Sequence, residues 1–185
     1  DEGSSYYRVA EHYGWWGDGG AAADGGGPSV SQRTVTEDFA ADSLQNLLFS
    51  LCRFREVVGS YPSRITVVSF SFKRRRFQEL HRRALRLPPA RFSFLGLQPS
   101  AASRFDLARA ERGERENALR YFEADPYGCE TPALAAKRDA RNPFRRTTPY
   151  PLSCPDIRAL FAWCGPGAFP ASLPWETTSQ APSPM

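Results

Sequence analysis

A run of four basic residues is the part of the sequence best suited to binding chemistry. Lys73-Arg74-Arg75-Arg76 directly follows an apolar stretch, and residues 73–91 hold eight basic side chains against one acid. Cations at a helix start oppose the helix dipole by roughly 0.3–1 kcal/mol each at exposed sites. A bound anion would remove this conflict, and open α/β sheets bind ligands where their strands end. The run therefore predicts an anion site, with a solvated basic helix face as the alternative.

Polar side chains on two other segments could complete such a site. Ser69 and Ser71 alternate with apolar residues at the end of that stretch, and Asp42 and Asn46 lie one turn apart on an earlier helix. Arg76 lies one turn into the following helix, from which its planar guanidinium can reach back toward a phosphate. We expect the following side chains to line one crevice at the carboxyl end of the strand: Asp42, Asn46, Ser69, Ser71, Lys73 and Arg76.

Recognisable catalytic and metal-binding motifs are absent from the sequence. The two histidines, His12 and His81, have no nucleophile at a recognisable spacing, and no Gly-x-Ser-x-Gly, Walker or Gly-x-Gly-x-x-Gly motif occurs. The four cysteines form no Cys-x-x-Cys pair and lie at no metal-ligand spacing from a histidine. We therefore expect no metal site and four free thiols, which are those of Cys52, Cys129, Cys154 and Cys164.

Length and composition fit one globular domain. The chain has 185 residues, of which 41% are hydrophobic and 13% aromatic, enough for a core. No apolar run approaches the roughly 20 residues that span a bilayer, and no signal-peptide pattern opens the chain, so we expect a cytoplasmic location without a membrane span. The aromatic residues near the basic run lie in predicted strands, and no RNA-binding motif surrounds them. We therefore do not expect a nucleic-acid partner.

Hydrophobic periodicity predicts alternating helices and strands from residue 36 onward. Thr36 is a good N-cap, apolar residues at helical spacing follow it, and Gly59 supplies a stop. A β-branched apolar run predicts a strand over 65–72, and a second strand is expected over 92–97. Further helices are expected over 4–13, 73–87, 114–122 and 155–163.

Helices that alternate with strands in this way indicate an α/β fold with parallel strands. We predict a Rossmann-like three-layer parallel sheet with helices on both faces. Because such a fold normally opens with a buried strand and a ligand-binding turn, whereas this chain opens in a helix, we infer that the first strand lies upstream. The predicted organisation is a Rossmann-like domain over 1–124 with a flexible Gly/Ala-rich loop at 17–31, an irregular Pro-rich appendage packed on it over 125–175, and a disordered tail over 176–185.

Several groups of residues resemble a known family. They are the helix from Glu37 to Ser50, the strand and basic run from Val67 to Phe77, the motifs at 125–129 and 142–147, and the late Trp163-Cys164-Gly165. Together they resemble the fungal branch of the YdcF-like (SanA/ElyC-like) domain-of-unknown-function family. The resemblance extends over most of residues 1–175.

The resemblance implies a Rossmann-like sheet with a polar site at its carboxyl edge, which would suit a nucleotide or an S-adenosylmethionine-like ligand. The family has a Gly-Gly turn before a Ser-Glu-Ala helix start; here Glu2 matches that carboxylate and the turn is missing. Gln45-Asn46 stands where the family has Glu-Asn, and Ser71 stands where it has Asp. Lys73 replaces the histidine of bacterial members, and Arg76 matches the family arginine.

These observations leave three functional hypotheses. The leading one is a domain that binds a small anionic or nucleotide-like ligand at the carboxyl edge of the sheet, with Glu2 added to the crevice residues. The alternative is a hydrolase or transferase that acts on a phosphorylated or envelope-type substrate, with Glu2 or Asp42 as general base. The third is a scaffold or degenerate fragment without a ligand.

Overall fold

The computed structural model describes residues 2–17, 28–100, 102–165 and 167–176. The chain divides into two compact units, Asp1–Ala40 and Ala41–Met185. Most of the expected loop at 17–31 and nearly all of the expected tail lie outside the described residues. None of the helices in the described part of the chain combines the length and apolar character that crossing a bilayer requires.

The first unit is built on helix α1 (Glu2–His12). Asp38 fixes its first turn, because the Asp38 carboxylate accepts hydrogen bonds from the backbone N–H and the hydroxyl of Ser4, both at 3.0 Å. Gly3 permits this approach, since a Cβ there would lie 2.7 Å from an Asp38 carboxylate oxygen. The helix expected over 4–13 is confirmed, with a slightly earlier start. The unit also holds the single turn η1 (Ser31–Arg33).

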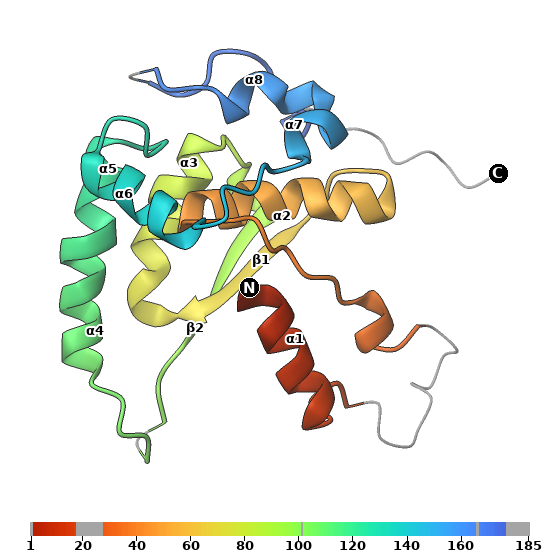
Figure 1. Cartoon of the computed structure of the whole chain (residues 1–185), viewed down its shortest axis with the longest axis vertical. Coiled ribbons are helices and arrows are strands. Elements are labelled where there is room, and N and C mark those ends of the chain that lie inside the picture. Colours follow the sequence, from red (N-terminus) through yellow and green to blue (C-terminus); the bar gives the residue numbers. More distant parts are fainter. Residues whose placement is uncertain (1, 18–27, 101, 166, 177–185) are drawn as a thin grey trace. The chain divides into compact units, whose positions relative to one another are not determined.

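The second unit is mostly helical (Figure 1). Its first half contains α2 (Ser43–Val58), β1 (Ile65–Phe70), η2 (Ser71–Lys73), the π-helical η3 (Arg75–His81), α3 (Arg82–Ala84), η4 (Pro89–Arg91) and β2 (Phe92–Leu97). Its second half contains α4 (Leu107–Glu114), the π-helical η5 (Arg115–Leu119), α5 (Arg120–Ala124), α6 (Pro132–Arg141), α7 (Tyr150–Ser153), η6 (Pro155–Ile157) and α8 (Arg158–Phe161).

β1 and β2 form a two-stranded parallel sheet and pair along their whole length. Both strands were predicted from the sequence, and η3 with α3 forms the helical connection between them (Figure 1). Alternate residues face opposite sides of the sheet. Phe94 on one face is buried, whereas Val68 on the other face is 56% exposed. Only one face of the sheet is therefore well covered by the described residues of this unit.

The predicted Rossmann-like three-layer sheet is wrong. No third strand pairs with β1 or β2 among the described residues, and after β2 the chain enters a helical rod made of α4, η5 and α5. The composition explains this difference, because residues 98–130 contain no valine, isoleucine or threonine, the β-branched residues that favour strands. Alanine, arginine and glutamate dominate there instead and favour helix.

Helix α2 begins later than predicted. Thr36 was the expected N-cap, but the helix starts at Ser43, and Asp42 is the N-cap. The Glu37 carboxylate accepts hydrogen bonds from the backbone N–H groups of Phe39 and Ala40 in a turn, and no helix starts there. The expected stop is confirmed, since Gly59 adopts a left-handed conformation with φ 85°.

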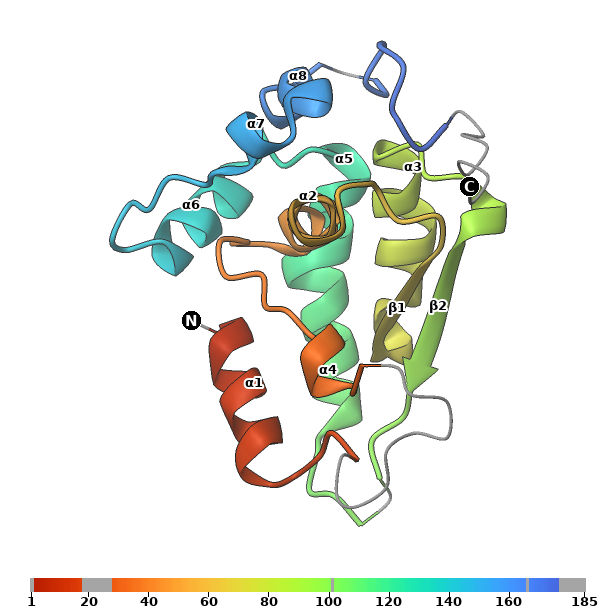
Figure 2. The ribbon, with the colours of Figure 1, turned by 90° about the vertical axis from the view of Figure 1, so that its right-hand side faces the viewer.

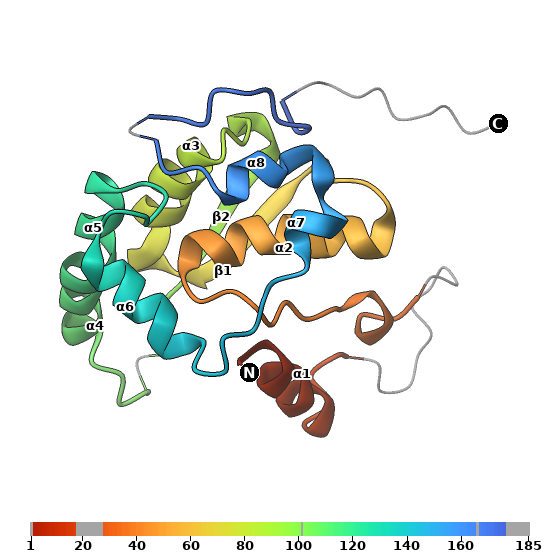
Figure 3. The ribbon, with the colours of Figure 1, turned by 45° about the horizontal axis from the view of Figure 1, so that its top comes forward.

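The C-terminal helices pack on α2, as Figure 3 shows for α7. Phe49 of α2 and Tyr150 of α7 have ring centroids 5.0 Å apart. The expected free thiols are not found: Cys52 is joined to Cys154, and Cys129 to Cys164. The pairs are 102 and 35 residues apart in sequence, so local cysteine spacing could not predict them.

The segment after α8 runs across α3 (Figure 2) and is held by hydrogen bonds. The buried Trp175 indole donates to the carbonyl oxygen of Leu85 at 2.7 Å. The Tyr127 hydroxyl donates to the carbonyl oxygen of Ala84 at 2.7 Å and accepts from the backbone N–H of Phe169 at 2.9 Å. These contacts attach a proline-rich segment to the core without regular secondary structure.

Candidate anion-binding site

Ser69 lies near the end of β1, and Ser71 follows the strand in η2, because β1 ends at Phe70, two residues before its predicted end. Ser69 pairs with Gly96 of β2, and Ser71 begins η2, where its hydroxyl donates to the carbonyl oxygen of Leu97 at 3.2 Å. A Cβ on Gly96 would lie 2.5 Å from the Ser71 hydroxyl oxygen. The strand end is therefore closely packed, and the Ser71 hydroxyl is used within the fold.

Lys73 lies over aromatic rings at the same strand end. Its ammonium nitrogen is 5.8 Å from the ring centroid of Phe70 and 5.9 Å from that of Phe72. These two rings stack at 5.5 Å, and Phe105 stacks on Phe70 at 5.2 Å. The ammonium group is thus held against ring faces by cation–π attraction.

Two of the three arginines that follow Lys73 are engaged by acids of the rod, whereas Arg74 donates to Gln78 and to the carbonyl oxygen of Phe94. Arg76 is buried and forms a two-pronged ion pair with Glu114, with Nε–Oε1 at 2.6 Å and Nη2–Oε2 at 2.7 Å. Arg75 pairs with Glu123 of α5. For these two arginines, the conflict with the helix dipole that led us to predict an anion is thus relieved within the chain. The Arg76 guanidinium points to Glu114 and does not reach back to the strand end.

Asp42 connects α2 to α6. Its Oδ1 accepts a hydrogen bond from the backbone N–H of Gln45 at 2.9 Å, and its Oδ2 accepts one from Nε of Arg138 at 2.6 Å. The Asp42 side chain is 2% exposed. Both carboxylate oxygens are therefore engaged in the fold, one as a helix cap and the other as an ion pair.

Arg138 also holds the turn before α6. Its Nη1 and Nη2 donate to the carbonyl oxygens of Gly128 and Tyr127, each at 2.8 Å. The chain turns over 125–128, since the Gly128 N–H donates to the Asp125 carbonyl oxygen at 3.0 Å and Gly128 has φ 68°. A Cβ on Gly128 would lie 2.5 Å from Nη2 of Arg138. Glycine is required here by both its conformation and the close guanidinium.

Asp125 organises the start of α6. Burial raises the pKa of its carboxyl. Hydrogen bonds from the backbone N–H groups of Thr131, Cys129 and Glu130 lower the pKa by more than burial raises it, so the pKa lies below its ordinary value. Asp125 is thus a buried anion that the helix start stabilises. It fixes the direction of α6 and hence of the cations that α6 carries.

Two cations of α6 have no acidic partner within the described part of the chain. Lys137 is half-buried, and its ammonium donates only to the carbonyl oxygen of Asn117, at 3.4 Å. Arg141 is exposed, and its Nη1 donates to the carbonyl oxygen of Ala41 at 2.9 Å. Burial, and then the charges of Arg141 and Arg76, lower the pKa of Lys137, although Asp42 and Glu114 act in the opposite direction. These groups therefore form one electrostatic cluster, the α2–α6 cluster, made of Asp42, Arg76, Glu114, Lys137, Arg138 and Arg141.

A serine–histidine pair lies at the start of α2. The Ser43 hydroxyl oxygen is 2.8 Å from Nε2 of His81, a distance that a nucleophile and a general base would need. His81 is fully buried, with its ring edge-on to Phe122 at 4.6 Å. Its Nδ1 has no hydrogen-bond partner among the described residues. Burial, and then the Arg76 cation, hold the pKa of His81 well below the ordinary 6.5.

The two remaining predicted site residues, Asn46 and Glu2, are both exposed. Asn46 lies one turn into α2, and Glu2 lies at the start of α1 in the first unit. The described residues contain no group of three or more His, Cys, Asp or Glu side chains that could hold a metal ion.

Helix α6 carries the residues that the sequence prediction missed. We assigned 132–141 to an irregular appendage because prolines punctuate its surroundings. A helix signal was present, with Pro132 in the first turn and basic residues in the last turn. The contact of Arg138 with Asp42 joins residues 96 positions apart, and no local pattern could reveal it.

A yeast protein is similar in sequence to this chain. Uncharacterized protein YOR238W of Saccharomyces cerevisiae is 36% identical over 122 residues, which make up 63% of this chain and 40% of the yeast protein. The chain thus spans less than half of that relative's length. No protein-family model matches the chain, and no solved structure shows significant similarity to it.

Proposed function

We propose that this chain binds a small anionic ligand, nucleotide-like in its phosphate chemistry, at the α2–α6 cluster. The observation that supports the proposal most directly is an imbalance of charge. The cluster holds four cations and two carboxylates, and each carboxylate is already paired with an arginine. Lys137 and Arg141 are the cations left without an acid in the described part of the chain.

The surroundings of Lys137 make an anion there favourable. Its pKa is lowered because burial and two neighbouring guanidinium groups outweigh the two carboxylates. A bound anion would reverse that balance and stabilise the charged ammonium. The first turn of α2 adds the positive end of a helix of 16 residues to the same region.

The anion would contact one flexible and one planar donor. Arg141 has five N–H donors, of which one is used on Ala41, and its guanidinium can bind a phosphate with two parallel hydrogen bonds. Lys137 would add a point charge. This ligand class agrees with the one that the YdcF-like resemblance implies. Membership of this chain in the YdcF-like family is itself a proposal. The cytoplasmic location expected from the sequence stays a prediction.

A hydrolase or transferase is the second candidate, and the Ser43–His81 distance is what favours it. A general base must accept a proton and become imidazolium. His81 resists that charge, because it is fully buried, lies near the Arg76 cation and has no carboxylate at Nδ1. We therefore rank binding above catalysis, and we interpret the pair as a hydrogen bond that fixes α2 to η3.

Calorimetric titration tests the proposal. Phosphate, pyrophosphate, a nucleoside monophosphate and S-adenosylmethionine are each titrated into the wild-type chain and into Lys137→Gln and Arg141→Gln. Loss of one charge-assisted contact costs about 1.5–3 kcal/mol, so each variant should bind roughly 10- to 150-fold more weakly. The matched control is Arg109→Gln on α4, which removes an exposed arginine outside the cluster.

The outcomes separate the three hypotheses. Binding that weakens in both cluster variants and not in the control supports the proposal. Equal affinity in all four proteins would place the anion elsewhere, and absence of binding by the wild-type chain would favour a domain without a ligand. Phosphate release or transfer from the nucleotide by the wild-type chain would favour the enzyme.

A further inference from the structure

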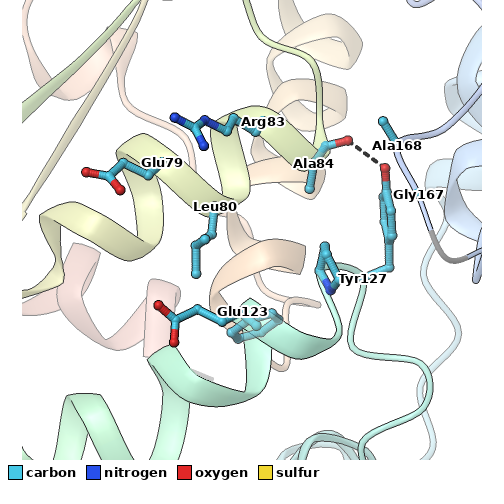
Figure 4. A pocket seen from close by; sticks show the side chains of 10 residues that line it. Glu79, Leu80, Arg83, Ala84, Glu123, Tyr127, Gly167 and Ala168 are labelled. Carbon is cyan, nitrogen blue, oxygen red and sulfur yellow. Dashed lines mark hydrogen bonds between the residues drawn. The ribbon is translucent and has the colours of Figure 1, made fainter.

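A separate apolar cavity lies between α5 and the helical segment formed by η3 and α3. Its volume is about 230 Å³, and Figure 4 shows Leu80 pointing across it toward α5, with Tyr127 forming the far wall. Ala84, Phe122 and Pro126 complete the apolar lining. The Tyr127 hydroxyl is fully engaged with backbone groups of Ala84 and Phe169, so the wall offers a ring face and no free polar group.

The entrance to this cavity carries two carboxylates and two guanidinium groups. Glu79 and Glu123 lie at the rim with Arg83 (Figure 4). Both carboxylates are paired with Arg75, which bridges η3 and α5. Arg83 is exposed, and no acid pairs with it in the described part of the chain. The rim therefore has no net charge: its two carboxylates share the Arg75 cation, and the Arg83 guanidinium is the group without an acidic partner in the described part of the chain.

We propose that this cavity binds a small apolar carboxylate, with an aromatic ring or short alkyl chain inside and the carboxylate on Arg83. An engineered cavity of about 150 Å³ holds a benzene ring, so the present volume leaves room for a ring and a short linker. Burial of the ring against Leu80 and Phe122 removes apolar surface from water. The carboxylate stays at the rim, where the guanidinium fork of Arg83 matches its geometry.

The chemistry of the rim distinguishes this ligand from the anion of the α2–α6 cluster. A phosphate without an apolar group would make no favourable contact with the cavity walls. A neutral aromatic alcohol would contact the walls but would form no ion pair with Arg83. An aromatic ammonium ion would be preferred only if the carboxylates of Glu79 and Glu123 dominated the rim. A carboxylate, an alcohol and an ammonium ion that carry the same aromatic ring therefore separate the contributions of shape and charge to binding.

The test is titration of 3-phenylpropionate, 3-phenylpropanol and 3-phenylpropylammonium, followed by NMR or calorimetry, on the whole chain. The carboxylate should bind about tenfold more tightly than the alcohol, the gain expected of one charge-assisted contact at an exposed rim. Arg83→Gln should bring the carboxylate to the affinity of the alcohol, and Leu80→Trp, which fills the cavity, should abolish binding of both. Arg109→Gln is the control and should bind as the wild type does.

The proposal fails if the wild-type chain binds none of the probes at millimolar concentration, or if the ammonium probe binds most tightly. It also fails if Arg83→Gln leaves the preference for the carboxylate unchanged. Because Arg83→Gln alters an exposed side chain, it should fold even if Leu80→Trp does not. Circular dichroism checks both variants.

Discussion

Replacing Arg76 by methionine should cost a large part of the stability of the second unit. The Arg76 and Glu114 side chains are 9% and 6% exposed and are joined by two short hydrogen bonds. Removing one partner of a buried pair leaves an uncompensated charge and costs about 3–5 kcal/mol. We expect about 3 kcal/mol, the lower end of that range, because the Lys137 ammonium is close enough to interact with Glu114.

The double variant Arg76→Met/Glu114→Leu gives the sharper result. With both charges gone, no buried ion lacks a partner, and such replacements are often neutral or stabilising. We therefore expect the double variant to lie within about 1 kcal/mol of wild type. The surface pair Arg53–Glu56 on α2 is the control, and Glu56→Gln should cost less than about 0.5 kcal/mol.

Urea unfolding followed by far-ultraviolet circular dichroism measures all four proteins. The comparison requires equal slopes with denaturant, because a changed slope reports a changed unfolded or native state. A cost below about 1 kcal/mol for Arg76→Met would refute the buried-pair reasoning. The reasoning would also be refuted if the double variant Arg76→Met/Glu114→Leu were no more stable than Arg76→Met alone.

Three further predictions follow from individual contacts. Thiol titration of the unfolded chain without reductant should find no free cysteine, because both pairs are disulfide-bonded; a count of four would contradict the pairing. The unfolded chain takes up a proton on His81 that the folded chain resists, so the free energy of unfolding should fall as the pH drops below about 6.5, and less so in His81→Gln. An equal pH dependence in both proteins would argue against a neutral buried His81. Tyr127→Phe should cost about 1–3 kcal/mol in urea unfolding, since it leaves two buried backbone groups without their partner; an unchanged midpoint would show that the hydroxyl contacts are dispensable.

The sequence predicted local elements better than their assembly. The apolar face of α2 and both strands follow from the side-chain periods of helix and strand, and the stop at Gly59 follows from the left-handed conformation that glycine allows. The third layer was inferred from an analogy with longer α/β sheets, and the absence of β-branched residues over 98–130 opposes it.

The candidate site shows the same division. Asp42 and Arg76 were chosen for their polarity, and both take part in the α2–α6 cluster. Their partners, Arg138 and Glu114, lie 96 and 38 residues away, and only the tertiary fold brings them together. A charge run indicates that counter-charges are needed, but it does not reveal whether a ligand or the chain itself supplies them.

The most direct test of anion binding at the α2–α6 cluster is a phosphate titration followed by backbone amide NMR of the full chain. We predict saturable shifts confined to the first turn of α2 and the last turn of α6, including residues 42–46 and 137–141. Shifts centred on the strand end at 69–73 would support the site first predicted from the sequence instead. Absence of saturable shifts, or shifts spread evenly over exposed arginines such as Arg109 and Arg112, would contradict the account.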